Sequence, residues 1–220
     1  MSLFGTSGVR GVFEKDLTLG LCHDVAQSLG TLLPGGSRVC LSTDSRVSGP
    51  AIKEAVISGL CNCAVEATDL GMLPTPALAL LTREWGFDTG VMITASHNPP
   101  EFNGIKLFNG NAMGYSRDQE QQIEAIYSGK SFRKGSCGTT HVAQGMRESY
   151  LQAISGKLPP RGINKRLKIV VDPGNGAASG FASWVFAQLG LPVMPTNDNP
   201  DGRFPGRNPE PKEDTLQNTI

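Results

Sequence analysis

The sequence has no excess of charge of either sign. Its 220 residues contain 20 lysines and arginines and 20 aspartates and glutamates, so the formal net charge at pH 7 is zero. Proteins that bind nucleic acid or anionic membranes through charge carry a basic patch or a basic excess. We therefore expect neither nucleic acid nor a membrane among the partners of this chain.

Long hydrophobic runs and a regular cysteine pattern are also lacking. Hydrophobic residues make up 39% of the chain, enough for a packed core, yet no apolar run approaches the roughly 20 residues that cross a bilayer. The first residues, Met1 to Gly5, lack the basic start and apolar centre of a secretory signal. The five cysteines are odd in number and irregularly spaced, which argues against a disulfide framework and fits a reducing cytoplasm. Cys61 and Cys63 form a lone C-x-C, which is more typical of two helix positions than of a metal site.

The chain does contain short apolar segments, some with the periodicity of a helix and some with that of a strand. Its 27 glycines and 15 prolines fall between these segments, as is typical of tight turns. The alternation of the two patterns predicts an α/β fold. Strands are predicted at residues 38–43, 65–70, 90–93, 104–109, 167–172 and 191–194, and helices at residues 18–33, 48–60, 74–85, 116–127, 146–154 and 177–189.

A linker composition at residues 158–165 predicts a domain boundary. We expect a first domain at residues 1–157 and the start of a second at residues 158–220. The second has too few strands to cover its own sheet, and residues 212–220 suggest only two helical turns, which are marginal without neighbours. We therefore expect a complete first domain and a truncated second one.

The most informative segment is Thr94-Ala-Ser-His-Asn-Pro-Pro100, which follows an apolar run typical of a buried strand. Ligands of open α/β sheets collect at the carboxyl ends of strands. Two prolines stiffen the loop, so Ser96 beside His97 is placed where a hydroxyl can exchange a phosphoryl or acyl group. The alternative is that these ordinary turn residues only connect two elements.

Two cationic residues are candidates for the same site. Arg10 lies in a segment with three glycines, where backbone N–H groups together with Thr6 and Ser7 can approach an anion; a flexible N-terminal arm is the alternative. Lys106 follows Ser96 by ten positions, although a lysine on a short strand often only protects a sheet edge.

The polar residues after the strand at 38–43 have a simpler interpretation. We interpret Asp44 and Arg46 as a loop ion pair near a helix start, and Ser48 as the cap of that helix. His141 is interpreted as a structural or surface residue.

Four motifs together resemble the α-D-phosphohexomutases, which include phosphoglucomutases, phosphomannomutases and phosphoglucosamine mutases. The run T-A-S-H-N-P followed by N-G-I-K is very specific, and the resemblance extends from Leu3 to about Leu216. It implies α/β/α units of three layers around mixed, mostly parallel sheets. The motifs are Gly5-Thr-Ser-Gly-Val-Arg-Gly11, Thr94-Ala-Ser-His-Asn-Pro99, Asn103-Gly-Ile-Lys106 and Asp201-Gly-Arg-Phe-Pro205.

The resemblance implies a phosphoserine enzyme of the isomerase class. Ser96 would carry a phosphoryl group and bind Mg²⁺ through its phosphate. The enzyme would interconvert 1-phospho and 6-phospho hexoses through a sugar bisphosphate intermediate. Lys106 and Arg10 would stabilise the phosphoryl oxygens or move a proton, and His97 would orient the loop or contact the phosphate. Thr6, Ser7 and Asn98 would contact the substrate or its phosphate, with Asn98 also fixing the turn.

The same resemblance predicts that parts of the site are missing. The family's metal-binding D-G-D-x-D-R loop does not occur in the sequence, nor do the sugar-recognition and phosphate-binding loops of the later domains. We therefore expect residues 1–220 alone to have negligible mutase activity. Two other functions stay open: a non-catalytic phosphate- or phosphosugar-binding module, and a phosphatase-like hydrolase that uses the same serine.

Overall fold

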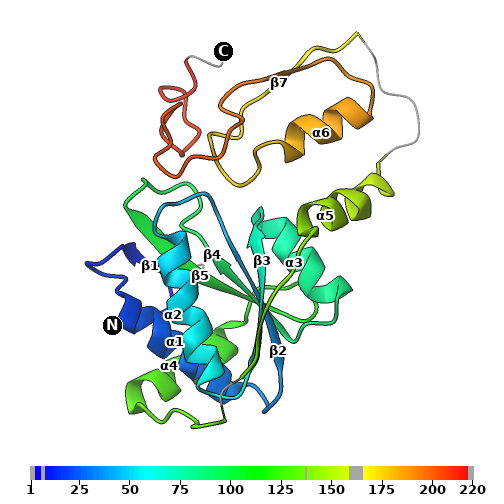
Figure 1. Ribbon diagram of the computed structural model, residues 1–220. Coiled ribbons are helices and arrows are strands. Elements are labelled where there is room, and N and C mark those ends of the chain that lie inside the picture. Colours follow the sequence, from blue (N-terminus) through cyan, green and yellow to red (C-terminus); the bar gives the residue numbers. More distant parts are fainter. Residues whose placement is uncertain (1–2, 6–7, 137, 159–165, 218–220) are drawn as a thin grey trace.

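The computed structural model describes residues 3–5, 8–136, 138–158 and 166–217, and these form two α/β units (Figure 1). The predicted linker therefore lies almost entirely outside the described residues. Within the described ranges, no helix is both long and apolar enough to cross a membrane. The four described cysteines are buried free thiols.

A mixed, mostly parallel sheet of six strands forms the centre of the first unit, in the order β1-β5-β4-β2-β3-β6. Strands β2, β3, β4 and β6 are parallel to one another, and β5 is antiparallel to both β4 and β1. The strands are β1 (Val9–Val12), β2 (Arg38–Thr43), β3 (Glu66–Met72), β4 (Thr89–Ile93), β5 (Phe102–Asn109) and β6 (Thr140–Val142).

Helices cover both faces of this sheet, which confirms the three layers (Figure 1). Helices α1 (Leu19–Leu32), α2 (Gly49–Cys61) and α4 (Arg117–Gly129) pack with Leu41 and Ile93 on one face. Helices α3 (Thr75–Glu84) and α5 (Met146–Ser155) pack with Met92 and Phe108 on the other. Successive side chains of a strand point to opposite faces of the sheet. Because helices cover both faces, the central strands are apolar at consecutive positions in the sequence.

Helix ends follow the signals that the sequence carries. Thr18 caps α1 by accepting a hydrogen bond from the N–H of Leu21 (3.2 Å). Ser116 and Gln119 form a capping box at the start of α4, in which each side chain accepts from the other residue's N–H. Such caps satisfy donors that the first turn of a helix leaves unpaired.

Two local predictions were incomplete or wrong, and one strand was missed. Ser48 is the N-cap residue of α2, as predicted, but its hydroxyl accepts from Asn103 Nδ2 (2.8 Å) and makes no capping bond. Among the described residues, 212–217 form turns and no helix, because Thr215 bonds back to the carbonyls of Glu210 and Lys212. The glycine-rich segment around Arg10 was not predicted as a strand, yet it forms β1 against β5.

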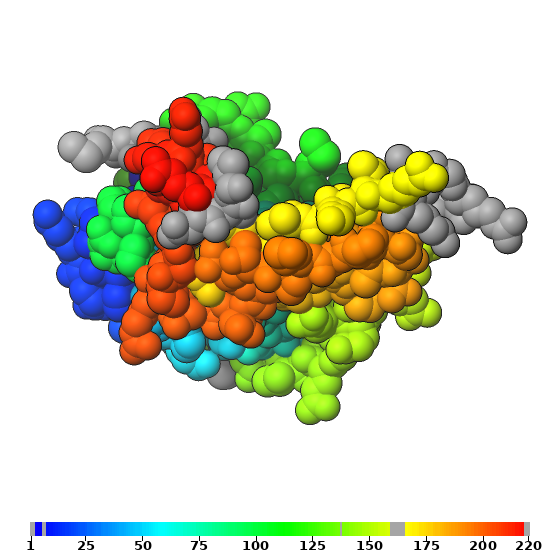
Figure 2. All heavy atoms as spheres, turned by 90° about the horizontal axis from the view of Figure 1, so that it is seen from above, coloured from blue at the N-terminus to red at the C-terminus, as the bar shows by residue number. Residues whose placement is uncertain are grey.

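The second unit contains β7 (Ile169–Val171), α6 (Phe181–Gln188) and β8 (Val193–Pro195), with β7 and β8 parallel. It lies across one end of the first unit, as the yellow-to-red band of Figure 2 shows. Phe181 joins the apolar cluster of α3 and α5, so the two units share part of a core. Turns after β7 and β8 face the loops that follow β2 and β4 (Figure 1).

Candidate active site

Strands β2 and β4 are parallel neighbours that end at the same edge of the sheet. Their register pairs Thr43 with Ile93, the last residue of each strand. The loops that follow, beginning at Asp44 and Thr94, therefore leave the sheet side by side. Such a pair of loops at carboxyl strand ends is the usual ligand position in an α/β sheet.

Ser96 is exposed on the second of these loops and has a left-handed backbone, with φ of 57°. Its N–H donates to Thr94 Oγ1 (2.9 Å), and its hydroxyl lies 3.3 Å from Nδ1 of His97, which is also exposed. A left-handed residue with a side chain costs on the order of 1 kcal/mol or more and persists only when its surroundings impose it. The contacts of this loop therefore decide the position of the hydroxyl.

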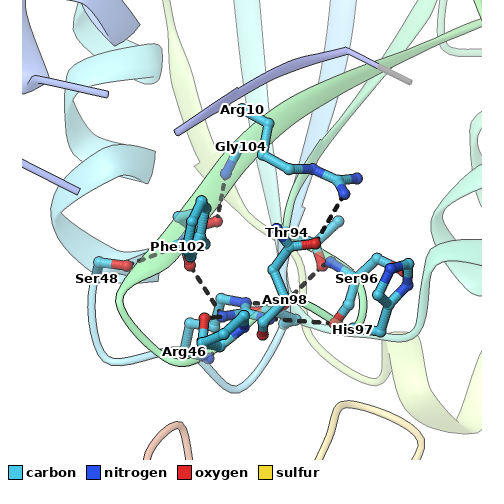
Figure 3. A network of polar contacts seen from close by, with 12 residues as sticks. Arg10, Arg46, Ser48, Thr94, Ser96, His97, Asn98, Phe102 and Gly104 are labelled. Carbon is cyan, nitrogen blue, oxygen red and sulfur yellow. Dashed lines mark hydrogen bonds and ion pairs between the residues drawn. The ribbon is translucent and has the colours of Figure 1, made fainter. Parts of the chain in front are cut away.

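Arg46 provides most of those contacts (Figure 3). Its side chain is fully buried, and Nε donates to Asp44 Oδ2 (3.1 Å). The other four hydrogen bonds go to backbone carbonyl oxygens of the serine loop, at Pro99 (2.5 Å), Phe102 (2.9 Å), Ser96 (3.2 Å) and Asn98 (2.6 Å). A guanidinium has five N–H donors, so one side chain fixes the loop and has no donor left over.

The buried charge of Arg46 is compensated locally. Burial lowers the pKa of Arg46, while the adjacent Asp44 carboxylate raises it, and an arginine stays protonated at any physiological pH. Asp44 Oδ2 also accepts from the Thr94 hydroxyl (2.6 Å), whose oxygen accepts the N–H of Ser96. One carboxylate thus connects the cation on one side of the loop to the serine amide on the other.

Arg10 reaches the same loop from β1, which lies beside β5 in the sheet (Figure 3). Arg10 Nη1 donates to Asn98 Oδ1 (3.0 Å). Gly104, the partner of Arg10 in the register, has no room for a side chain: a Cβ there would lie 2.5 Å from Val9 O and 3.0 Å from Thr94 O. The structure therefore places Arg10 and Asn98 together with the serine loop.

Lys106 is connected to the site through the register of the sheet. It pairs with Met92 across β4 and β5, and Met92 lines a cavity together with Ser96. Its ammonium lies 5.3 Å from the ring centroid of Phe108. Within the described part of the chain, no hydrogen bond or ion pair joins Lys106 to Ser96, so its part in the site stays a prediction. Since β5 lies between β1 and β4, Lys106 is not on a sheet edge.

A cavity of about 180 Å³ lies beside the serine, between the two units. Ser45, Thr94 and Ser96 line it from the first unit, and Gly176 and Phe204 from the second. The hydroxyl oxygen of Ser45 is buried and has no hydrogen-bond partner among the described residues. Because this oxygen is closed off from solvent, it does not face the open space of the cavity.

Two groups of predicted site residues are not tested by this geometry. Thr6 and Ser7 lie outside the described residues. In the described ranges, no group of three or more His, Cys, Asp or Glu side chains is placed to hold a metal ion. The residues present thus do not form a magnesium site by themselves, and the role of Ser96 as a ligand through its phosphate stays a prediction.

The sequence interpretation missed the most extensive contact of the site. Asp44 and Arg46 do form the predicted ion pair, but the pair supports the serine loop instead of only a helix start. One signal could have shown this: both residues follow a strand, as Ser96 does, and carboxyl ends of adjacent parallel strands meet at one edge.

Models of two known domains match most of the chain. Residues 1–134 match the model described as "Phosphoglucomutase/phosphomannomutase, alpha/beta/alpha domain I", and residues 148–220 match the corresponding domain II. Together with the serine loop at the sheet edge, these matches define the class of protein. The chain belongs to the phosphoglucomutase/phosphomannomutase family.

Curated relatives and solved structures agree with this assignment. The chain is 40% identical over 221 residues to a probable phosphoglucosamine mutase of Methanobrevibacter smithii, covering 99% of the chain and 49% of the relative. It is 38% identical over 218 residues to a phosphopentomutase of Thermococcus kodakarensis, covering 98% and 47%. A phosphoglucomutase/phosphomannomutase family protein of Burkholderia thailandensis superposes with a TM-score of 0.85 at 30% identity, covering 100% of this chain and 49% of that one. The chain thus spans about half the length of the curated relatives it matches.

Proposed function

We propose that this chain contributes the phosphoserine half of a phosphohexomutase. Ser96 alternately donates a phosphoryl group to a hexose phosphate and receives one from the resulting sugar bisphosphate, so 1-phospho and 6-phospho hexoses interconvert. The observation that carries this proposal is the exposed, left-handed Ser96 on a loop that Arg46 holds by four carbonyl oxygens. Phosphoryl transfer depends mainly on positioning and charge stabilisation, which such a loop supports.

The neighbouring residues receive their roles from chemistry and placement. Arg10, anchored on Asn98, supplies fixed positive charge to the phosphoryl oxygens. Lys106 is the general acid or base, because a lysine can lose its proton in a dry site and an arginine effectively cannot. His97 orients the serine hydroxyl, and Thr6 and Ser7 contact the substrate phosphate.

The rest of the site belongs to segments that this chain does not contain. We assign residues 1–157 to the first family domain and residues 158–220 to the beginning of the second. Magnesium would neutralise charge on the phosphoryl group, a contribution of several kcal/mol in order of magnitude. Without its aspartate ligands, the 220-residue chain by itself has negligible activity. We place the working enzyme in the cytoplasm.

A chimera tests this function directly. Residues 1–220 are joined to the C-terminal half of the Methanobrevibacter smithii relative, and conversion of glucose, mannose and glucosamine 1-phosphates is measured with Mg²⁺. We expect turnover by the chimera, phosphorylation of Ser96 by mass spectrometry, and negligible turnover by residues 1–220 alone. Ser96→Ala should abolish both turnover and phosphorylation, whereas Ser128→Ala, at an exposed serine of α4, should change neither.

Other outcomes identify the other functions. Turnover that persists in Ser96→Ala contradicts the role of this serine. Release of inorganic phosphate without isomer formation indicates a hydrolase. Binding of hexose phosphate with neither turnover nor phosphoserine indicates a non-catalytic binding module.

A further inference from the structure

The second unit contacts Arg46 directly. Phe204 has only 8% of its surface exposed, and its ring centroid lies 5.1 Å from the guanidinium carbon of Arg46. Arg46 uses its five in-plane donors on Asp44 and the serine loop, which leaves only the faces of the guanidinium for other contacts. Phe204 therefore covers a face of the group that holds the serine loop.

The backbone around Phe204 is pressed against the loop that carries Arg46. A Cβ added to Gly202 would lie 2.3 Å from Ser45 O and 2.5 Å from Val47 N, so only glycine permits this approach. The atoms that such a Cβ would meet belong to the backbone, which cannot rotate away as a flexible side chain can. The second unit thus fits closely over residues 45–47.

Phe204 is held in place by its own turn. Its N–H donates to the carbonyl of Asp201 (3.0 Å), and the Asp201 carboxylate accepts from the N–H of Arg203 (2.9 Å). The N–H of Asp201 donates to the carbonyl of Asn175 (2.9 Å), which ties this turn to the one that follows β7. These hydrogen bonds within the second unit therefore fix the position of the Phe204 ring beside Arg46.

We propose that Phe204 is a positioning residue for Ser96 and acts through Arg46. The ring attracts the cation by its negative face and excludes water that would compete for the guanidinium donors. Arg46 then keeps four carbonyls of the serine loop in one arrangement, which imposes the left-handed conformation on Ser96. The inference rests on the proposed function for the chemistry of Ser96, but the coupling itself does not require phosphoryl transfer.

The chain offers a matched control for this contact. Phe181 is also in the second unit, has 7% of its surface exposed, and carries a guanidinium, that of Arg147, 4.7 Å from its ring centroid. It packs in the apolar cluster with α3 and α5. Replacing either ring by leucine removes a similar cation contact and a similar buried aromatic, but only Phe204 lies on Arg46.

The test uses the 220-residue chain and amide hydrogen exchange. Three loop amides have assigned acceptors: those of Ser96, Asn98 and Phe102, on Thr94 Oγ1 and on the carbonyls of Ala95 and Pro99. We expect Phe204→Leu to speed their exchange about tenfold and Phe204→Tyr, which keeps the ring, to leave it near the wild-type rate. Phe181→Leu should leave these amides unchanged even where it lowers overall stability.

A second measurement reports on the guanidinium itself. The Nε–H resonance of Arg46 senses the ring current of Phe204, so it should shift in Phe204→Leu and not in Phe181→Leu. If Phe204→Leu changes neither this resonance nor loop exchange, or if Phe181→Leu changes both equally, the proposal is overturned. A loop that loosens in Phe204→Leu while the chimera never phosphorylates Ser96 refutes the proposed function and leaves the coupling intact.

Discussion

Two turns, one in each unit, are built from the same parts. The turn after β4 contains Ser96 and the turn after β7 contains Asn175, and each of these residues has φ of 57°. Beside each lies an arginine paired with an aspartate: the buried Arg46 with Asp44 at 3.1 Å, and the partly buried Arg207 with Asp172 at 2.8 Å.

The turns differ in the direction of their polar groups. Asn175 is buried and uses its whole side chain inside the protein, donating to Asn199 O (2.9 Å) and accepting from the N–H of Gly206 (3.1 Å). Ser96 instead exposes its hydroxyl. Similar strand–turn geometry therefore produces a closed structural turn in one unit and an accessible nucleophile in the other.

The two arginines also differ in what they hold. Arg207 donates to the Asp172 carboxylate (2.8 Å) and to the Asp172 carbonyl (3.3 Å), and also to the nearby carbonyls of Asn208 (2.9 Å) and Pro209 (3.2 Å). Arg46 donates to carbonyls about 50 positions away. We conclude that the contacts of Arg207 stay within the second unit, whereas Arg46 shapes the serine loop of the first unit. The following predictions test this difference.

The largest effect is expected for Arg46→Ala. Removing this cation leaves Asp44 without its charge partner and four loop carbonyls without donors, so the free energy of unfolding should fall by about 3–5 kcal/mol. Urea denaturation measures the loss. Arg38→Ala, which removes a half-exposed arginine 3.8 Å from Glu66, serves as control and should cost less than about 1 kcal/mol. Equal losses would show that burial of Arg46 does not increase its contribution to the free energy of unfolding.

A smaller effect is expected for Arg207→Ala. Asp172 keeps the N–H of Gly174 (2.8 Å) and Asn197 Nδ2 (3.1 Å) as donors, so the loss should be about 2–3 kcal/mol. Amide exchange of the loop at residues 96–102 should not change, in contrast to Arg46→Ala. Faster exchange there would contradict the assignment of Arg207 to the second unit.

Alkaline pH should destabilise the first unit through its buried thiols, because all five cysteines precede residue 158. Burial raises the pKa of Cys22 to about 12 and that of Cys40 to about 11. The unfolded chain loses these protons at lower pH than the folded one, so stability is complete below the unfolded pKa and falls as pH rises above it. We expect a loss of about 1 kcal/mol per thiol between about pH 9 and 10.

Chemical denaturation over that pH range measures the slope. Cys22→Ala combined with Cys40→Ala should remove this part of the pH dependence, whereas Arg207→Ala should leave it unchanged. A slope that survives the double substitution must come from other groups.

The smallest effect is expected for an exposed ion pair. Lys130 Nζ lies 2.6 Å from Asp24 Oδ2. Burial raises the pKa of Asp24, but hydrogen bonds from Lys130 and His23 outweigh it and leave the pKa below its ordinary value. The pair therefore stabilises above the unfolded pKa of Asp24 and less as pH falls through the folded one. Lys130→Met should cost less than about 1 kcal/mol near neutral pH and nothing measurable in acid.

The stability loss expected for Lys130→Met should be compared with that for Arg46→Ala. Both pairs join a cation to a carboxylate at hydrogen-bonding distance, but only that of Arg46 is withdrawn from water. If the two substitutions cost the same in urea titrations at neutral pH, solvent screening does not distinguish the pairs.

The sequence was sufficient for the elements with strong periodicity. The helix predicted at residues 18–33 is α1, and the strand predicted at 38–43 coincides with β2. The loop with Ser96 was placed correctly at a strand end, because an apolar run and two prolines fix its limits. The strand predicted at 104–109 lies within β5, where Ile105 and Leu107 share one core cluster, as the alternation of a strand requires.

The contacts of Arg46 could not be predicted in the same way. Its acceptors are backbone carbonyls, which every residue has, so no residue type marks them. Strand β1 was missed because its glycine and arginine are poor strand formers, and pairing with β5 overrides their propensity. The sequence around Phe204 is typical of a turn, and only the packing of the second unit brings its ring to Arg46.

The position of β1 has a consequence for the order in which the chain folds during its synthesis. This strand is at one edge of the sheet, and its partner β5 is synthesised only after α1, β2, α2, β3, α3 and β4. Arg10 and Asn98 are 88 positions apart, so their contact closes a long loop, and such non-local pairing forms slowly. The oldest segment of the nascent chain thus cannot join the sheet before β5 is made, and the site gains its exposed cation only at that stage.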